Sequence, residues 1–360
     1  MAYFNVKSLL NQVEINDMNG QFGFFDLATR YEQLSVQGDP LEKLNAVIEW
    51  KIFLPLINRA FCKTKQSPAG RKPFNRLMMF KLLLLQSLYN LSDAQTEYQI
   101  KDRLSFMRFL GLALGDAIPD EKTIWAYREV LTETGVLKRL FSRFDKFLAE
   151  KGLFAEFGHI VDASLIEAPK QRNTREENRQ IKEGELPESF KENINKLKQK
   201  DIDARWTIKN GKSYYGYKDH INIDGKNKLI RSYEITDAAK SDKWELEKLI
   251  DAVPRNDKHV WADGAYFSAE QEESLINKGY ISRILNRTKK FPDHSAIARE
   301  NSRRSKIRKR VEHVFGFMQN SMGGKFIRTI GIARAKVKIG LMNLVYNICR
   351  YEQLCRIGTF

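Results

Sequence analysis

The sequence predicts an α/β protein in which an all-helical region precedes a mixed five-stranded sheet. Two observations support this fold class. From residue 159 onward, short apolar segments alternate with amphipathic helical segments in the order strand, strand, strand, helix, strand, helix, strand, helix. Before residue 153 the apolar residues recur mainly at helical spacing, with capping residues and glycines at the expected helix ends.

The helical region is expected to be a domain of its own, residues 67–152, after a weakly patterned segment, residues 1–66. Ser92 precedes Gln95 at capping-box spacing, so a helix should begin there. Asp120 should cap a second helix that ends at Gly135. Successive capped helices fit a helix-turn-helix DNA reader or a dimerisation module, and both interpretations stay open. Three arginines expected to be exposed would favour DNA: Arg103, Arg108 and Arg128.

Residues 153–360 are expected to form the α/β domain, with a charged insertion at 168–212 that is poor in large apolar residues. The strands expected in it are His159–Glu167, Tyr214–Asp224, Lys228–Thr236, His259–Asp263 and Tyr280–Leu285. Asp242 and Glu245 are expected to cap a helix that continues to Val253. A three-strand meander followed by alternating helices and strands is typical of a ribonuclease H-like core.

Three acids occupy positions where a carboxylate is costly unless it is paired or binds a metal. Asp162 lies within the first apolar strand, Asp263 ends another, and Glu312 lies on an amphipathic helix expected across Ile307–Asn320. Carboxylate oxygens suit Mg²⁺ or Mn²⁺, and two such ions can activate an attacking oxygen and stabilise a leaving one in phosphoryl transfer. We therefore expect these acids to be the catalytic residues and ligands of two Mg²⁺ ions, for which Mn²⁺ can substitute.

The positive charge of the chain is concentrated at its C-terminal end. The net charge is +16; residues 283–310 hold eleven Lys and Arg against two acids, and residues 311–360 hold seven against two. A polyanion is the natural partner of such a surface, and DNA fits the phosphoryl-transfer site. The side chains expected to contact DNA are Arg303, Arg304, Lys306, Arg308, Lys309, Arg310, Gln319, Lys325 and Arg328.

Seven short segments resemble the DDE transposases of bacterial insertion sequences, the insertion-sequence-five group in particular. They are Leu91–Gln99, Asp102–Leu112, Pro119–Trp125, Val161–Pro169, Tyr215–His220, Trp261–Tyr266 and Arg310–Gly316. The resemblance implies a ribonuclease H-like core, recognition of terminal inverted repeats, and metal-dependent strand cleavage and strand transfer. It places the catalytic roles on Asp162, Asp263 and Glu312, and implies a homodimer as the active form.

The chain departs from the family signature around the glutamate, in which a Tyr, an Arg, the Glu and a Lys follow one another. Arg308 stands four residues before Glu312, as the signature requires, but Ser305 and Gln319 replace the Tyr and the Lys. The way in which this helix grips a terminal phosphate is therefore expected to differ from that of its relatives.

Two other functions remain open from the sequence: a catalytically silent DNA-binding protein on the same fold, and a metal-dependent nuclease without strand transfer. His220 and His313 could contact DNA but are expected to be structural, Asp219 to be ion-paired or to support its neighbours, and Tyr266 and Phe267 to pack in the core. No apolar run reaches 18 residues, the first residues lack a signal-peptide pattern, and the three cysteines (Cys62, Cys349 and Cys355) lack metal-site spacing. We therefore expect a cytoplasmic protein, associated with the nucleoid when bound to DNA.

Overall fold

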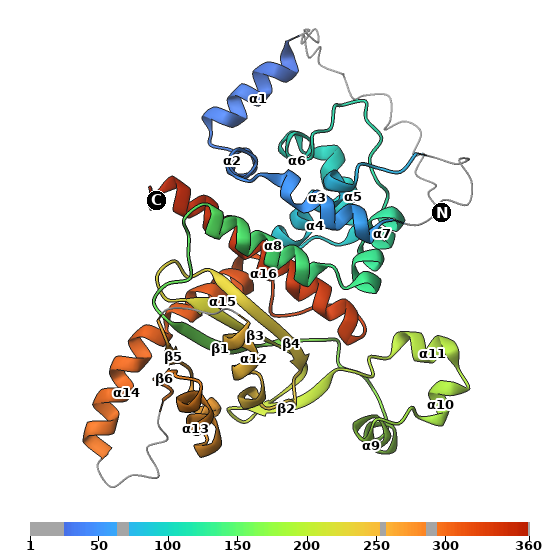
Figure 1. Ribbon diagram of the computed structural model, residues 1–360. Coiled ribbons are helices and arrows are strands. Elements are labelled where there is room, and N and C mark those ends of the chain that lie inside the picture. The colour runs from blue at the N-terminus through green and yellow to red at the C-terminus, as the bar shows by residue number, and fades with distance from the viewer. Residues whose placement is uncertain (1–24, 63–71, 253–256, 286–293, 359–360) are drawn as a thin grey trace, which may run out of the picture.

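The computed structural model describes residues 25–62, 72–252, 257–285 and 294–358, and Figure 1 shows their arrangement. The start of the chain, the turn-rich segment before Lys72 and part of the basic segment 283–310 lie outside these residues. The N-terminal half is helical, as predicted. Its elements are α1 (Asp26–Val36), α2 (Pro40–Val47), the 3-10 helix η2 (Trp50–Phe53), α3 (Leu54–Ala60), α4 (Arg76–Leu88), α5 (Asp93–Asp102), α6 (Leu104–Leu110), α7 (Glu121–Thr134) and α8 (Leu137–Glu150).

Two helix starts follow the predicted capping chemistry. Ser92 accepts the backbone N–H of Gln95, whose side chain in turn accepts the N–H of Ser92, so the capping box of α5 is confirmed. The side chain of Asp120 accepts the N–H of Thr123 at the start of α7, and the helix ends at Gly135 in a left-handed conformation with φ 57°.

The sheet is mixed, as predicted. Strand β1 (His159–Glu167) pairs antiparallel with β3 (Lys212–Asp224) and parallel with β5 (His259–Trp261). Strand β4 (Ile230–Asp237) is antiparallel to β3, and β6 (Ile281–Ser282) is parallel to β5. The last two strands are shorter than expected, and the insertion contributes a sixth strand, β2 (Arg205–Lys209), that the sequence pattern did not reveal.

Gly216 marks the point where β3 changes partners. Beyond it β3 pairs with β4, whereas before it β3 pairs with β2. A Cβ atom at Gly216 would lie 2.2 Å from the carbonyl oxygen of Ile166 and 2.9 Å from the amide nitrogen of Ala168. Since these are backbone atoms of the neighbouring strand, only glycine fits here.

We expect Gly216→Ala to destabilise the protein by about 3 kcal/mol, because the sheet must separate locally to admit one methyl group. Urea unfolding should show a lower midpoint at unchanged slope. Gly115→Ala is the matched control, since nothing lies within 4 Å of its added Cβ. Equal stability of the two variants would contradict the close packing at Gly216.

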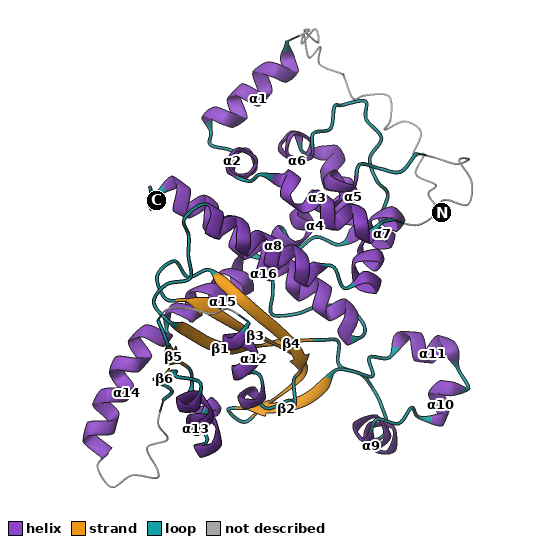
Figure 2. Cartoon of the chain, in the orientation of Figure 1, coloured by secondary structure: helices purple, strands orange, loops and turns teal. Residues whose placement is uncertain are grey.

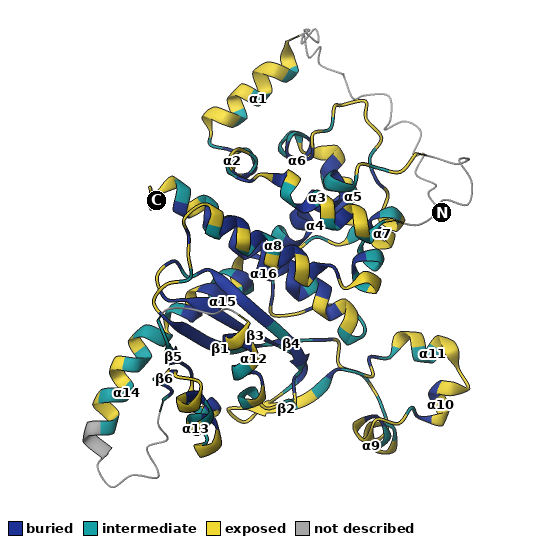
Figure 3. Cartoon of the chain, in the orientation of Figure 1, coloured by how far each residue is buried: buried dark blue, intermediate teal, exposed yellow. Residues whose placement is uncertain are grey.

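Two hydrophobic cores lie on opposite faces of the sheet. The smaller joins Val161 and Val260 to α12 (Leu246–Asp251) and α13 (Ala269–Asn277). The larger joins the other face to the N-terminal helices through α16 (Ile332–Arg356), which packs on α4, α7, α8 and β4 (Figures 2 and 3). The division into 1–66, 67–152 and 153–360 stays a prediction. None of the described helices has both the length and the apolar character of a membrane span.

The insertion forms a small helical lobe that projects from the body in Figure 1. It contains α9 (Arg175–Glu183), α10 (Glu188–Lys191) and α11 (Ile194–Gln199) before β2. Its base is fixed to the sheet, because the buried hydroxyl of Tyr217 donates to the carboxylate of Asp201 at 2.8 Å. Asp203 accepts the N–H of Ile332, which ties the base to α16 as well.

Two expectations about the later helices were wrong. The helix expected across Ile307–Asn320 is divided at Lys309 into α14 (His294–Arg308) and α15 (Arg310–Ser321). Asp242 does not cap α12; it lies in a 3-10 helix, η3 (Asp242–Trp244), and pairs with Lys218 at 2.8 Å. A charged partner on β3 therefore replaces the predicted capping contact.

Candidate active site

Asp162 lies in the middle of β1 with its carboxyl group largely buried beneath the end of α14. Its Oδ2 accepts a charge-assisted hydrogen bond from Arg308 at 2.5 Å, and its Oδ1 accepts the N–H of Ala163 at 2.8 Å. Burial raises the pKa of this carboxyl to about 6, although Arg308 and the Ala163 N–H act in the opposite direction. At pH 7 the group is therefore mostly ionised, in agreement with its ion pair.

Asp263 reaches the same region from the neighbouring strand. Because β1 and β5 are parallel, with Ile160 opposite Trp261, Asp263 comes level with Asp162 two residues after the end of β5. Asp263 is exposed, caps the 3-10 helix η4 (Gly264–Tyr266) through the N–H of Gly264, and its charge helps to raise the pKa of Asp162. Two carboxylates from neighbouring parallel strands thus lie level with each other.

Glu312 comes from α15 and is joined to Asp162 through an arginine. Arg308 donates to Glu312 Oε1 at 3.2 Å from one guanidinium nitrogen and to Asp162 from the other. The spacing of four residues across the break at Lys309 makes this bridge possible. A cation therefore already stands between two of the three acids.

The three side chains fit a divalent metal by their chemistry. All three provide hard oxygen ligands. The Arg308 guanidinium lies between Asp162 and Glu312 and neutralises the negative charge that a metal ion would otherwise neutralise. In the part of the chain that the structure describes, no three His, Cys, Asp or Glu side chains converge closely enough to hold a metal. Binding would require Arg308 to leave at least one of its two carboxylates.

The basic residues expected to contact DNA fall into two groups. Five are exposed: Arg303, Lys306, Lys309, Lys325 and Arg328. The other four make internal contacts. Arg304 donates to the carbonyl of Ile284, Arg308 bridges the acids, Arg310 donates to the carbonyl of Gly225, and Gln319 donates to Ser164 of β1 at 2.8 Å.

Exposure of the helical-domain arginines was predicted wrongly for two of the three. Arg128 forms two hydrogen bonds of 2.7 Å with Asp93, and Arg108 pairs with Asp39 and Glu42. These side chains stabilise the packing of the helices on one another. Arg103 lies against the Phe106 ring and is exposed.

Other polar residues singled out in the sequence are mostly structural. His220 is buried and contacts Thr236, and burial lowers its pKa to about 4, so it is neutral. Tyr266 is buried in the smaller core. Of the two roles expected for Asp219, ion pairing is not found among the described residues: its buried carboxyl accepts one hydrogen bond from Asn343, and burial raises its pKa to about 7.

Two residues near the acids escaped the sequence reasoning. Ser164 receives the hydrogen bond of Gln319 and so fixes α15 on β1. Lys209, at the tip of the β2–β3 hairpin, is close enough to Asp162 for its charge to lower that pKa. Neither residue can be identified from its local sequence. The contact of Ser164 depends on the docking of α15, and the position of Lys209 near Asp162 depends on how the β2–β3 hairpin folds.

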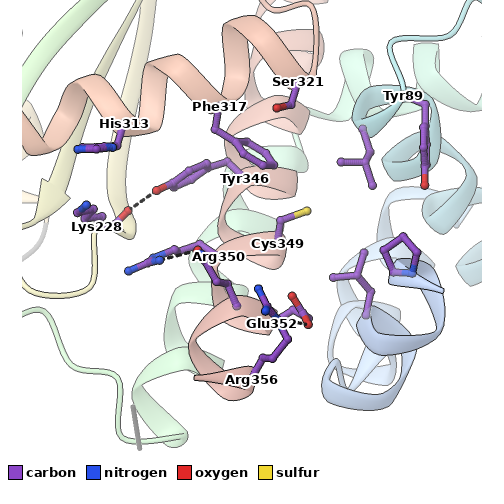
Figure 4. Close-up of a pocket in the computed structure, with 14 residues that line it drawn as sticks. Tyr89, Lys228, His313, Phe317, Ser321, Tyr346, Cys349, Arg350, Glu352 and Arg356 are labelled. Carbon is purple, nitrogen blue, oxygen red and sulfur yellow. Dashed lines mark hydrogen bonds and ion pairs between the residues drawn. The ribbon is translucent and has the colours of Figure 1, made fainter. Parts of the chain in front are cut away.

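A groove of about 640 Å³ opens on another face of α15, where His313 and Phe317 line it (Figure 4). Leu44 is among the apolar residues that line it; Figure 4 shows Tyr89 on one side of the groove and Lys228 on the other. None of the three acids lines it. The groove and the carboxylate site are therefore separate features.

Comparison with known families specifies the class of protein to which this mixed sheet and its helical N-terminal region belong. Residues 158–348 match the family described as transposase DDE domain, and residues 29–130 match the transposase domain (DUF772). The first match covers more than half of the chain, so the chain belongs to the DDE transposase family. It is a DNA transposase with a ribonuclease H-like catalytic core, and the family depends on divalent metal.

One solved structure is distantly similar. It is the cryo-EM structure of a piggyBac transposase synaptic complex with hairpin DNA, at a TM-score of 0.44 and 12% identity, covering 89% of this chain and 76% of that chain. This likeness is weak.

Proposed function

We propose that this transposase acts on the ends of a bacterial insertion sequence of the insertion-sequence-five group, and that Asp162, Asp263 and Glu312 are its catalytic acids. The observation that supports this assignment is the contact of Arg308 with both Asp162 and Glu312, at 2.5 and 3.2 Å, beside Asp263 at the end of the adjacent strand. The three acids come from separate parts of the chain, and Arg308 links two of them.

The three acids would hold two Mg²⁺ ions, with Mn²⁺ as a substitute; when bound, the metal activates an attacking oxygen and stabilises the leaving one. The chain contributes position and charge. Asp162 is held rigidly by β1 and by the N–H of Ala163, whereas Glu312 and Asp263 are exposed and can adjust. Arg308, released from an acid, can grip a phosphate oxygen with two N–H groups. The nucleophile is water for cleavage and a DNA 3′-hydroxyl for transfer.

The exposed cations of α14, of the start of α15 and of the loop after it would bind the terminal inverted repeat. Arg303, Lys306, Lys309, Lys325 and Arg328 provide charge without a fixed geometry, so they would bind phosphates regardless of sequence. Recognition of the repeat itself would come from the helical region, residues 67–152, and two copies of the chain would bring two ends together.

We expect binding of duplex DNA to weaken steeply with salt. Five phosphate contacts correspond to a slope of about −4 for log K against log salt concentration, because each contact releases condensed counterions. Fluorescence anisotropy between 50 and 200 mM NaCl measures it. The double variant Lys306→Gln/Lys309→Gln should reduce the slope by about 2, whereas the control Lys182→Gln/Lys198→Gln, which changes exposed lysines on α9 and α11, should not. A flat salt response of the unaltered protein would contradict this DNA surface.

The proposed reaction is tested with a plasmid that carries the coding sequence and its flanking DNA. In Mg²⁺, purified protein should release 3′-hydroxyl ends and join them to a target plasmid, and EDTA should abolish both products. Nicked products without joined ones would favour the nuclease, and DNA binding without cleavage would favour the silent DNA-binding protein.

A further inference from the structure

A polar pocket of about 510 Å³ lies where the segment matched by the DUF772 family meets the segment matched by the DDE family. Asp93 and Arg128 line it from the N-terminal helices. Arg328 and Thr329 line it from the loop between α15 and α16, and Lys338 lines it from α16. We call it the Lys338 pocket.

The pocket carries more positive than negative charge. Three cations line it against a single acid. Asp93 is already neutralised, because both of its oxygens accept hydrogen bonds of 2.7 Å from Arg128. Lys338 has no hydrogen bond or ion pair among the described residues, and Arg328 is exposed at the rim. The protein therefore leaves two positive charges unmatched here.

Two donors in this region lack an acceptor in the described structure. The hydroxyl of Thr329 is buried without a hydrogen-bond partner. The pKa of Lys338 is lowered to about 8, mainly by burial and also by the neighbouring Arg128, while Asp93 acts in the opposite direction. A desolvated cation beside another cation is unfavourable unless an anion compensates it. The Lys338 pocket is thus built for an anion.

The position of the pocket indicates which anion. The loop that lines it is joined to the end of β1, since Glu167 donates its N–H to Lys325 O and accepts the N–H of Ile327, both at 2.9 Å. Glu167 stands five residues after Asp162 on the same strand. That separation is about 17 Å, or about five base-pair steps of 3.4 Å. DNA that is held at the acids and runs along β1 would therefore come near the loop that lines the pocket.

We propose that the Lys338 pocket binds a backbone phosphate of the same DNA molecule that the catalytic acids cleave. The proposal rests on the proposed function for its ligand, and it gives the junction of the two matched segments a role in holding DNA. Lys338 and Arg328 would bind the phosphate oxygens, with the Thr329 hydroxyl as an additional donor, while Arg128 stays with Asp93.

The decisive variant is Lys338→Met, which keeps the length and apolar stem of the side chain and removes the charge. The free protein should melt at the same or a higher temperature, because an uncompensated cation is lost. Its Kd for duplex DNA in anisotropy at 100 mM NaCl should rise about tenfold, and the salt slope should fall by about one. A lysine that served only the fold would give the reverse: a lower melting temperature and unchanged DNA binding.

Lys336→Met is the matched control, since Lys336 is exposed on the same helix outside the pocket. Its Kd should change less than twofold. Inorganic phosphate at 20 mM should raise the melting temperature of the unaltered protein but not that of Lys338→Met. If phosphate stabilises the protein while both variants bind DNA equally, the pocket takes a free anion and the proposal is overturned. If the unaltered protein does not cleave DNA, but Lys338→Met still binds DNA more weakly than Lys336→Met, only the proposed function is overturned.

Discussion

Asp162→Asn should reduce DNA cleavage and strand transfer by at least about 1000-fold, or about 4 kcal/mol of transition-state stabilisation. The substitution keeps the shape of the side chain and its N–H contact with Ala163, but removes the charge that pairs with Arg308 at 2.5 Å. Asp263→Ala and Glu312→Gln should have comparable effects, because each removes one of the three acids. The measurement is single-turnover cleavage of labelled end DNA in Mg²⁺.

Binding controls separate chemistry from folding in these variants. Each should bind duplex DNA with an affinity within about threefold of the unaltered protein, since the exposed cations that carry binding are untouched. Asp251→Asn, which changes an exposed acid of α12, is the matched control and should cleave normally. Undiminished cleavage by Asp263→Ala would show that Asp263 is not a catalytic residue.

Much of the fold is predictable because the signals are local. The bounds of β1 were predicted from its apolar residues and are confirmed at both ends. The helix starts at Ser92 and Asp120 depend on side chains that bond to their own first turn, so no distant contact can override them. The order of strands and helices then predicted a mixed sheet, whereas the parallel pairing of β1 with β5, which brings Asp263 level with Asp162, is a finding of the structure.

The features that were missed depend on distant contacts. Nothing local distinguishes Arg128, which holds Asp93, from an arginine free to bind DNA. The break at Lys309 and the bridge from Arg308 to both acids require α14 and α15 to dock on β1. Strand β2 exists only because β3 extends past Gly216 and offers it an edge, while its own sequence is charged and half exposed.

Asp219→Asn should stabilise the protein, and by more as the pH rises. The carboxyl of Asp219 is fully buried, and burial raises its pKa from an ordinary value of 3.8 to about 7. Between these values the folded protein holds a proton that the unfolded chain has lost, so stability falls by about 1.4 kcal/mol for each pH unit. The loss totals about 4 kcal/mol at pH 8, where Asp219 is ionised in both states. A neutral amide avoids this loss at every pH.

The surroundings of Asp219 suit an amide. Asn343 donates to Asp219 Oδ1 at 3.1 Å, while Asp219 Oδ2 and Asn343 Oδ1 have no partner among the described residues. The new Nδ2 group can donate to Asn343, as a protonated carboxyl would. Urea unfolding at pH 4.5 and pH 8 should show a small difference between variant and unaltered protein at the lower pH, and about 3 kcal/mol or more at the higher. The exposed-acid variant Asp251→Asn should show no such trend. An advantage of Asp219→Asn that stays constant from pH 4.5 to 8 would mean that Asp219 is ionised throughout this range, and that a charge compensates its burial.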